Sequence, residues 1–281
     1  MTPMKTWNEL RAEAWDALWR RRWFWRLFLA VVIFGIIGFA ANQIMQGAVL
    51  HELFSDGGYI AQVHEALQAH QRPPMPPTGQ IMRLVFGFAL MYLVQFVIQG
   101  AGAFGLSGLY LRVARGEEVG PTWTRGLMDG FKRPLGVLAL FFRLWLQLTL
   151  WWMLLLVPGI IAAYRYRAAW YFKVEHPDWS AGECIAASSK LMKGWKWKAF
   201  CFDCSYWKII VAIMVPFLVV SCSLLMNTIQ KVNGIVPAYG VTALLLFFAV
   251  VAGIILSVIF AQYSAVGRAA FYRDQKAIAE A

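Results

Sequence analysis

Six apolar stretches separated by polar segments run through this 281-residue chain and limit what it can fold into. They are Leu27–Gly47, Ile81–Leu111, Leu135–Leu155, Pro158–Phe172, Ile209–Ile229 and Val236–Ala265. A hydrocarbon core of ~30 Å needs ~20 apolar residues in a helix. Five stretches meet that length, and Pro158–Phe172 is short. We therefore predict an all-α polytopic membrane protein with six transmembrane helices, paired as three hairpins.

The basic residues lie on alternate sides of these stretches. With the N-terminus in the cytoplasm, 22 of the 26 Lys and Arg residues are cytoplasmic, in the segments 1–26, 112–133, 165–208 and 267–281. This positive-inside pattern predicts that both termini are cytoplasmic. The net charge of +11 is then explained by topology and by contact with anionic headgroups on the cytoplasmic side, and we expect no nucleic-acid binding.

Residues 135–172 could form either one long kinked helix or a hairpin. A single helix would place the cations of the C-terminal segment 267–281 outside, against the charge pattern. The tripeptide Val157-Pro158-Gly159 supplies a turn, so we predict the hairpin.

Three stretches that precede the first, third and fifth apolar stretches resemble one another. Each begins with P-x-x-[ST], and residues 127–132 (LMDGFK) match residues 191–196 (LMKGWK). Thr6 with Glu9, and Ser180 with Glu183, have the spacing of capping boxes that begin helices. We predict a single membrane domain, 1–281, with a pseudo-threefold repeat of units at about 3–113, 121–172 and 177–272. The alternative is that any interfacial helix selects such residues.

Residues 48–80 form the one sizeable outer loop. The segment 72–77 (RPPMPP) is expected to be a stiff connector, and Ile60–His70 a short amphipathic helix.

Small residues recur at every fourth position of the last stretch, including Gly253, Ser257 and Ala261. Small residues let membrane helices approach closely, so we predict a helix-packing face there and a central position for the second, fourth and sixth stretches. Chance in an Ala- and Gly-rich membrane chain is the alternative.

The segment 157–166 (VPGIIAAYRY), followed by Pro177, Ser180 and residues 192–197 (MKGWKW), resembles the bacterial membrane family called domain of unknown function 975. The resemblance runs from about residue 100 to 275, although Gln262-Tyr263 stands where the family usually has Pro-Tyr. It implies a polytopic protein of the bacterial cytoplasmic (inner) membrane, without an assigned activity.

The apolar stretches contain no Asp, Glu or His. That argues against a relay of buried carboxylates, an intramembrane metalloprotease or a di-metal site. Cys201 and Cys204 have CxxC spacing, but without a second pair or a nearby His this is a weak signal. We predict no catalytic residues, no metal and no cofactor.

Two polar clusters are the candidate ligand-binding residues. Arg143 lies eight residues into the third stretch, and Gln147 shares its face one turn on. Tyr164, Arg165 and Arg167 lie where the fourth stretch meets the cytoplasm. We expect Arg143 to face the protein interior near both Gln147 and the second cluster, where paired guanidinium groups suit a phosphate or carboxylate. Snorkelling of Arg143, and positive-inside anchoring by the second cluster, are the alternatives.

Two functions remain open at this point. One is a non-enzymatic membrane protein that translocates or handles an amphipathic or anionic solute or lipid. The other is a membrane scaffold or accessory subunit without a ligand of its own. A membrane enzyme ranks third because the stretches lack a catalytic constellation.

Overall fold

The computed structural model describes residues 5–19, 23–54, 59–70, 72, 78–117, 123–232 and 239–280, which form twelve α-helices and no strand. The helices are α1 (Trp7–Trp19), α2 (Trp23–Phe54), α3 (Tyr59–Gln68), α4 (Thr78–Ala114), α5 (Trp123–Lys132), α6 (Pro134–Leu154), α7 (Leu156–Tyr166), α8 (Ala169–Glu175), α9 (Ala181–Leu191), α10 (Lys196–Cys204), α11 (Trp207–Val232) and α12 (Tyr239–Glu280). The predicted all-helical class is confirmed for these residues.

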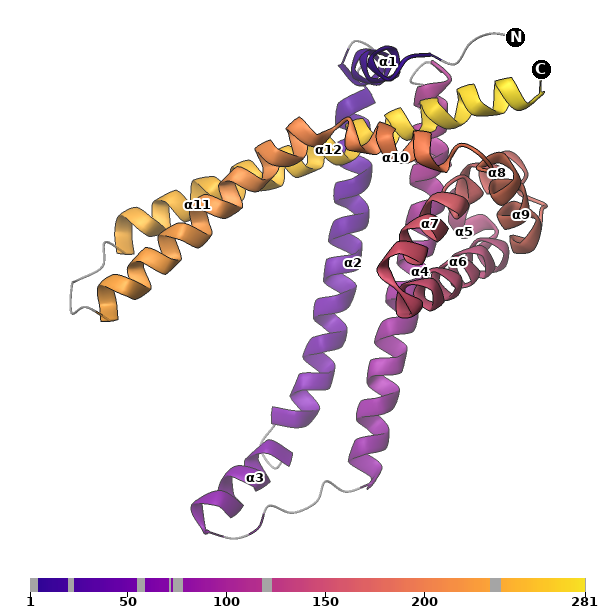
Figure 1. The fold of residues 1–281 in the computed structure, drawn as a ribbon. Helices are drawn as coiled ribbons and strands as arrows, with labels where there is room; N and C mark the ends of the chain where they lie inside the picture. The colour runs from indigo at the N-terminus through magenta and orange to yellow at the C-terminus, as the bar shows by residue number, and fades with distance from the viewer. Residues whose placement is uncertain are drawn as a thin grey trace.

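Two long helical hairpins extend from one compact end of the molecule (Figure 1). One hairpin pairs α2 with α4, and the other pairs α11 with α12. The compact end, called the hub below, contains α1, α5, α8, α9 and α10 together with the adjoining ends of α2, α4, α6 and α12. Helices α4 and α12 contact each other in the hub, and the two hairpins diverge beyond it.

Among the described residues, five helices are long and apolar enough to cross a membrane, judged by length and composition. They belong to α2, α4, α6, α11 and α12. Their surfaces expose many large apolar side chains, such as Ile36, Phe86, Leu218 and Phe247, each more than 60 % exposed. Water-soluble proteins rarely expose apolar surface on this scale, so the hairpins are suited to a lipid environment.

The fourth predicted span differs from expectation. Instead of one helix over Pro158–Phe172, the chain forms the 11-residue α7, a turn at Arg167 and Ala168, and then α8. The Ser188 side chain explains the break, because its hydroxyl accepts from the Ala168 backbone N–H and donates to the Arg165 carbonyl. These bonds occupy the Ala168 N–H and the Arg165 carbonyl, which a continuous helix would pair with its own backbone.

Helices α6 and α7 form the predicted hairpin, but the tripeptide 157–159 that was expected to form the turn lies inside α7. The reversal occurs at Leu155, whose extended backbone separates the two helices. Gly159 then packs on Trp152, where a Cβ would lie 2.8 Å from the indole ring. A glycine is therefore needed at this crossing, because a larger residue would push the helices apart.

Two other expectations concern the loop after α2 and the length of the last helix. The short outer helix is present as α3, while the connector 73–77 lies outside the described residues. The last span continues past its predicted end at Ala265 to Glu280, because Val266, Phe271 and Tyr272 are buried in the hub and hold the helix there.

Both predicted capping boxes are present. At the start of α1, the Thr6 N–H donates to Glu9 Oε2 at 2.7 Å, and the Glu9 N–H donates to Thr6 Oγ1 at 3.4 Å. Ser180 and Glu183 make the same two bonds at the start of α9, at 2.7 and 3.3 Å. Each box supplies acceptors for two backbone N–H groups that have no partner within the first helical turn.

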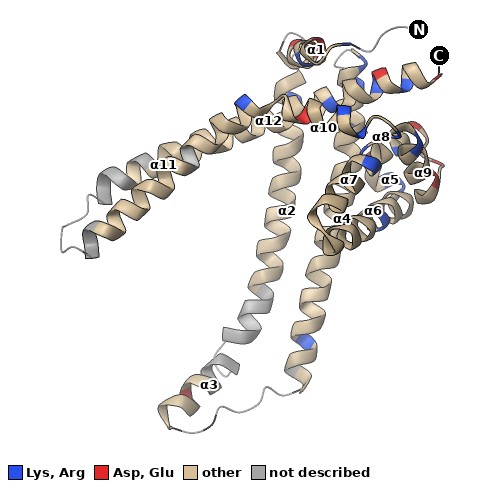
Figure 2. Cartoon of the chain, viewed as in Figure 1, with Lys and Arg blue, Asp and Glu red and all other residues tan. Residues whose placement is uncertain are grey.

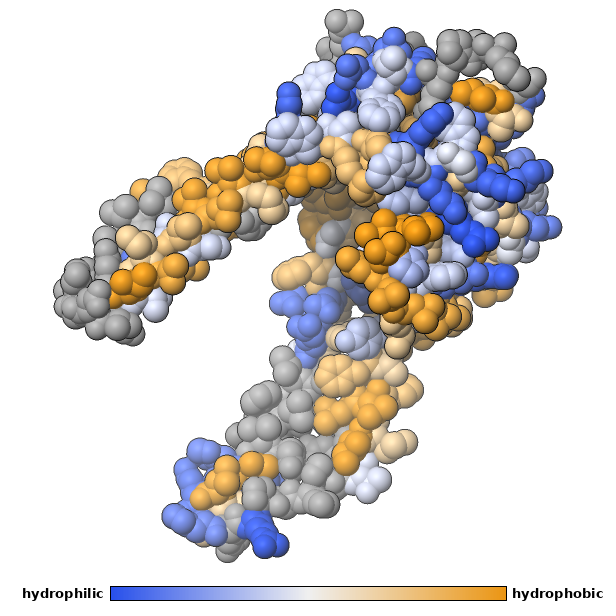
Figure 3. Space-filling view, viewed as in Figure 1, coloured by the Kyte–Doolittle hydropathy of each residue, from blue (hydrophilic) through white to orange (hydrophobic). Residues whose placement is uncertain are grey.

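The apolar core of the protein lies in the hub rather than in the hairpins. Leu10, Leu27, Leu140, Phe202 and Phe271 are each at most 1 % exposed and belong to one cluster. Charged residues gather over the same end (Figure 2), whereas the hairpins are almost uncharged and their surface is mainly hydrophobic (Figure 3). The molecule is thus polar at the hub and apolar along its arms.

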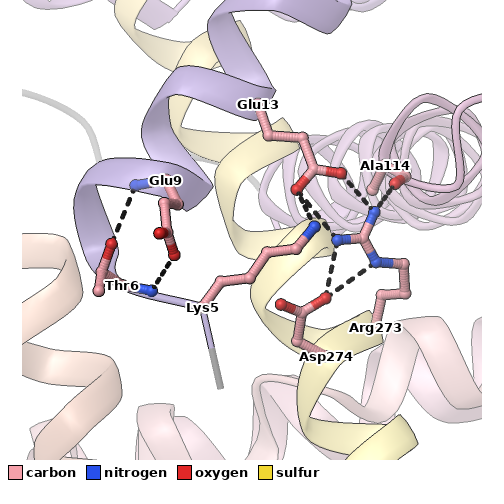
Figure 4. A network of polar contacts seen from close by, with 7 residues as sticks. All are labelled: Lys5, Thr6, Glu9, Glu13, Ala114, Arg273 and Asp274. Carbon is pink, nitrogen blue, oxygen red and sulfur yellow. Dashed lines mark hydrogen bonds and ion pairs between the residues drawn. The ribbon is translucent and has the colours of Figure 1, made fainter. Parts of the chain in front are cut away.

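An ion-pair network fastens α1 to the other helices of the hub (Figure 4). Arg273 of α12 binds Glu13 at 2.7 Å and Asp274 at 2.7 Å, and it also donates to the Ala114 carbonyl at the end of α4. Lys5 donates to Glu13 Oε2 at 2.8 Å, and the same oxygen also accepts from Arg273 Nη2 at 3.1 Å. Burial raises the pKa of Glu13, but the hydrogen bonds from Arg273 and Lys5 outweigh it and hold that pKa below its usual 4.5.

Candidate functional site

The sequence-predicted cluster at the end of α7 closes on Asp203 of α10. Arg167 donates to both oxygens of Asp203 at 3.1 Å, and the Tyr164 hydroxyl donates to Oδ2 at 3.0 Å. Arg268 of α12 lies 3.5 Å from the same carboxylate. The bidentate pair joins α7 to α10, so the fork of Arg167 that would bind an anion is already occupied by a carboxylate.

The other predicted residues do not join this cluster in any described contact. Arg165 donates to Ser189 of α9 at 3.1 Å. Arg143 is exposed, and its Nη1 lies 3.0 Å from the Cβ position of Gly182 at the start of α9. Gln147 is half-buried on α6, and its Oε1 has no hydrogen-bond partner among the described residues. The ligand-binding role of these residues stays a prediction.

The residues predicted for helix packing lie on the second hairpin. Gly253 is buried on α12, and Ser257 is half-buried and donates to the Gly253 carbonyl at 2.7 Å. Ala261 is exposed in the isolated chain. Helix α12 packs against α11 along this arm. The three predicted packing positions are not all covered, since Gly253 is buried, Ser257 is half-buried and Ala261 is exposed.

A cavity of about 240 Å³ in the hub contains chemistry that sequence reasoning missed. It lies between α4, α5, α6, α8 and the loop after α8. Its walls are apolar at Phe104, Val137 and Val174, and five charged residues line it as well. The charged residues are Arg112, Asp129, Lys132, Arg133 and Lys173. Among the described residues that line the cavity, four cations thus occur with a single acid.

Glycines allow the helices around this cavity to approach. A Cβ on Gly130 of α5 would lie 2.7 Å from the Ala101 carbonyl of α4, so α5 rests directly on the α4 backbone. A Cβ on Gly126 would lie 3.0 Å from Arg112 Nη1, and one on Gly136 would lie 3.2 Å from Lys173 Nζ. Each helical glycine costs about 1 kcal/mol relative to alanine, so the space beside these cations is maintained at a cost in helix stability.

Lys173 is the least exposed of the cavity cations, at 4 %. Its ammonium donates to the carbonyls of Pro177, at 2.9 Å, and Trp179. No carboxylate lies within 4 Å of it in the described part of the chain. The carboxylate of Glu183 acts on Lys173 electrostatically but forms no ion pair with it. A buried cation without a direct carboxylate partner is expensive, which marks the position as unusual.

The other three cations have carboxylate partners at the edge of the cavity. Lys132 binds Asp129 at 2.6 Å, Arg133 binds the highly exposed Asp178, and Arg112 lies 4.0 Å from Glu117. Exposed pairs of this kind contribute little to stability, so a ligand anion could compete for these cations at small cost.

One signal in the sequence could have pointed to Lys173. It is the single charge in the run Trp170–Val174, which is otherwise aromatic and aliphatic. The positive-inside count treats it as one more cytoplasmic cation, because that count ignores depth. The cavity that Lys173 lines together with residues of α4, α5 and α6 is a tertiary relationship that no local pattern encodes.

The described residues contain no group of three His, Cys, Asp or Glu side chains suited to a metal ion. Cys184 is buried, and burial raises the pKa of its thiol. Cys201 and Cys204 lie on the last turn of α10, and both are free thiols. What the geometry favours is binding of an anion by clustered cations.

No protein-family model matches the chain, and no curated protein or solved structure resembles it at a significant level. The resemblance to domain of unknown function 975 stays a prediction that rests on the motifs at 157–166 and 192–197.

Proposed function

We propose that this chain is a non-enzymatic bacterial inner-membrane protein that handles an anionic amphipathic solute or lipid at its cytoplasmic face. The observation that carries the proposal is the cavity in the hub, where four cations meet one acid and apolar walls lie beside charged ones. A site with those two kinds of wall suits a molecule that has a negative head and an apolar remainder.

The proposal includes six crossings with the hub on the cytoplasmic side. Helices α6 to α8 supply the third and fourth crossings, with α7 as a short return. The start of α6 and the end of α8 meet in the hub, since Lys173 Nζ approaches Gly136. A segment that leaves and re-enters the hub preserves the sidedness that the positive charges require. The clustering of charges at the hub supports the same orientation (Figure 2).

A threefold repeat remains part of the proposal. Helices α1, α5 and α9 each precede a long apolar helix or hairpin, and two of them begin with capping boxes. The third unit inserts α10 before α11. An offset of 174 residues aligns the first unit with the third and pairs Trp23 with Trp197. These two tryptophans differ, because Trp23 is 2 % exposed and Trp197 71 %. These differences would have arisen as the three units took distinct places in the hub.

The test is binding of simple amphipaths to the purified full chain in a neutral maltoside detergent. Native mass spectrometry would count the bound molecules of dodecanoate, dodecyl phosphate and zwitterionic dodecylphosphocholine. We expect at least one anionic amphipath to bind in preference to the zwitterion, and Arg112→Gln to weaken it. Lys193→Gln is the control, because Lys193 is an exposed cation on a turn away from the cavity. Equal binding of anions and zwitterion would favour the scaffold function instead.

A further inference from the structure

We propose that the hub cavity recognises a phosphate group, with Lys173 as the buried donor that binds it. This inference rests on the proposed function and names the head of the anionic ligand. The phosphate could belong to a lipid headgroup or to inorganic phosphate, and the experiment below separates the two sources.

The number and kind of cations favour phosphate over a carboxylate. Once Asp129 is paired with Lys132, the cavity still has Arg112, Arg133 and Lys173, which come from α4, the α5–α6 junction and α8. Donors on three sides match the several oxygens and the double charge that a phosphate monoester can carry. A carboxylate has one charge and two coplanar oxygens, so it would satisfy one guanidinium fork and leave the others.

Lys173 is placed to serve as the inner donor. An ammonium group has three N–H donors, and the carbonyls of Pro177 and Trp179 accept two of them. The absence of a side chain on Gly136 keeps the space beside Nζ open, where a Cβ would lie only 3.2 Å away. A bound anion would supply the direct ion pair that this buried cation lacks among the described residues, since its ammonium donates to two carbonyls and Glu183 acts on it without forming an ion pair.

The size and edges of the cavity agree with this ligand. A volume of about 240 Å³ accommodates a phosphate and a few waters, since a water takes roughly 30 Å³ of liquid volume. Phe104 and Val137 form an apolar wall next to the charges, against which the carbon attached to a phosphate ester could lie. Arg112 and Arg133 at the edge would exchange weak partners, Glu117 and the exposed Asp178, for the phosphate oxygens.

The experiment compares dodecyl phosphate, dodecanoate and inorganic phosphate on the full chain by native mass spectrometry and ³¹P NMR. We expect dodecyl phosphate to bind about tenfold or more tightly than dodecanoate, because it adds charge-assisted bonds. Lys173→Gln should weaken dodecyl phosphate by a similar factor, and Lys193→Gln should leave it unchanged. If inorganic phosphate binds as well as dodecyl phosphate and displaces it, the source is soluble phosphate. If only the alkyl ester binds, the source is a lipid headgroup.

Two outcomes would overturn the inference. Equal binding of dodecanoate and dodecyl phosphate would remove the phosphate claim while the proposed function stood, whereas loss of all preference for anions would remove both. Because Lys173 also fixes the loop after α8, Lys173→Gln could fail to fold. Gly136→Ala is the second variant, since its Cβ would crowd Nζ without removing the charge. Unchanged phosphate binding in a folded Gly136→Ala chain and in Arg112→Gln would place the ligand elsewhere.

Discussion

Tyr206 stands directly over Gly267, so that its hydroxyl occupies the space a Cβ on Gly267 would need. Tyr206 follows α10, and Gly267 lies in the part of α12 that enters the hub. The tyrosine is 2 % exposed, and its ring packs edge-on against Phe202 and Tyr263. The contact between Tyr206 and Gly267 therefore sets how closely α12 approaches the first residues of α11.

We expect Gly267→Ala to lower the free energy of unfolding by about 1–3 kcal/mol, the range typical of an overpacked core. Tyr206→Phe alone should be close to neutral, because the hydroxyl has no hydrogen-bond partner among the described residues. The double variant should recover part of the loss, since removing the hydroxyl opens room for the new methyl group. Thermal unfolding of the four proteins in one detergent measures this coupling, and strictly additive effects would contradict the close contact.

The second hairpin offers a matched pair of positions on one helix. Gly253 is buried on α12, whereas Val251 is 37 % exposed. Gly253→Leu should reduce the yield of folded protein in detergent, because the side chain must separate the packed helices. Val251→Leu adds one methylene on an exposed side and should leave the yield near that of the parent. Size-exclusion profiles give the comparison, and equal yields would remove the packing argument for the small-residue ladder.

The features that sequence could predict are those encoded within a few residues. Apolar length gave the five long helices, and the spacing of Thr6 with Glu9 gave the start of α1, because capping joins groups three residues apart. The break between α7 and α8 could not be predicted in this way. It depends on Ser188, whose hydroxyl comes from a helix some twenty residues further along the chain.

The same distinction applies to the candidate site. Arg167 was predicted as a ligand-binding residue, which stays a prediction, and its partner Asp203 could not be predicted, since 36 residues separate them. The sequence pattern also could not show that Arg143 lies beside Gly182 while Lys173 lies inside a cavity. Both are single cations in apolar runs. Their surroundings differ only through tertiary packing, which places α9 beside Arg143 and lets α5 line the cavity that contains Lys173.

Reporter fusions test the proposed sidedness. Fusions after Glu65, Lys190 and Glu280 should report outside, inside and inside, in that order, because the hub carries most of the cations. The fusion after Lys190 is decisive for the α6–α7 hairpin, since a single crossing between α6 and α8 would move it outside. Paired phosphatase and fluorescent-protein reporters at each position would give opposite signals. A periplasmic signal at Lys190 would rule out six crossings.

The network around Glu13 predicts how the anchoring of α1 depends on pH. The folded-state pKa of Glu13 lies below its ordinary 4.5, so the carboxylate contributes stability that is fully present above about that pH. The contribution is lost as the pH falls through the lowered pKa, because the protonated acid no longer attracts Arg273 and Lys5. Glu13→Gln should therefore unfold at a lower temperature than the parent at pH 7, and the difference should shrink on acidification. Glu65→Gln, on the exposed helix α3, is the control and should show no such difference. If the difference in unfolding temperature between Glu13→Gln and the parent stays constant from neutral to acidic pH, side-chain packing, and not charge, holds α1 against α12.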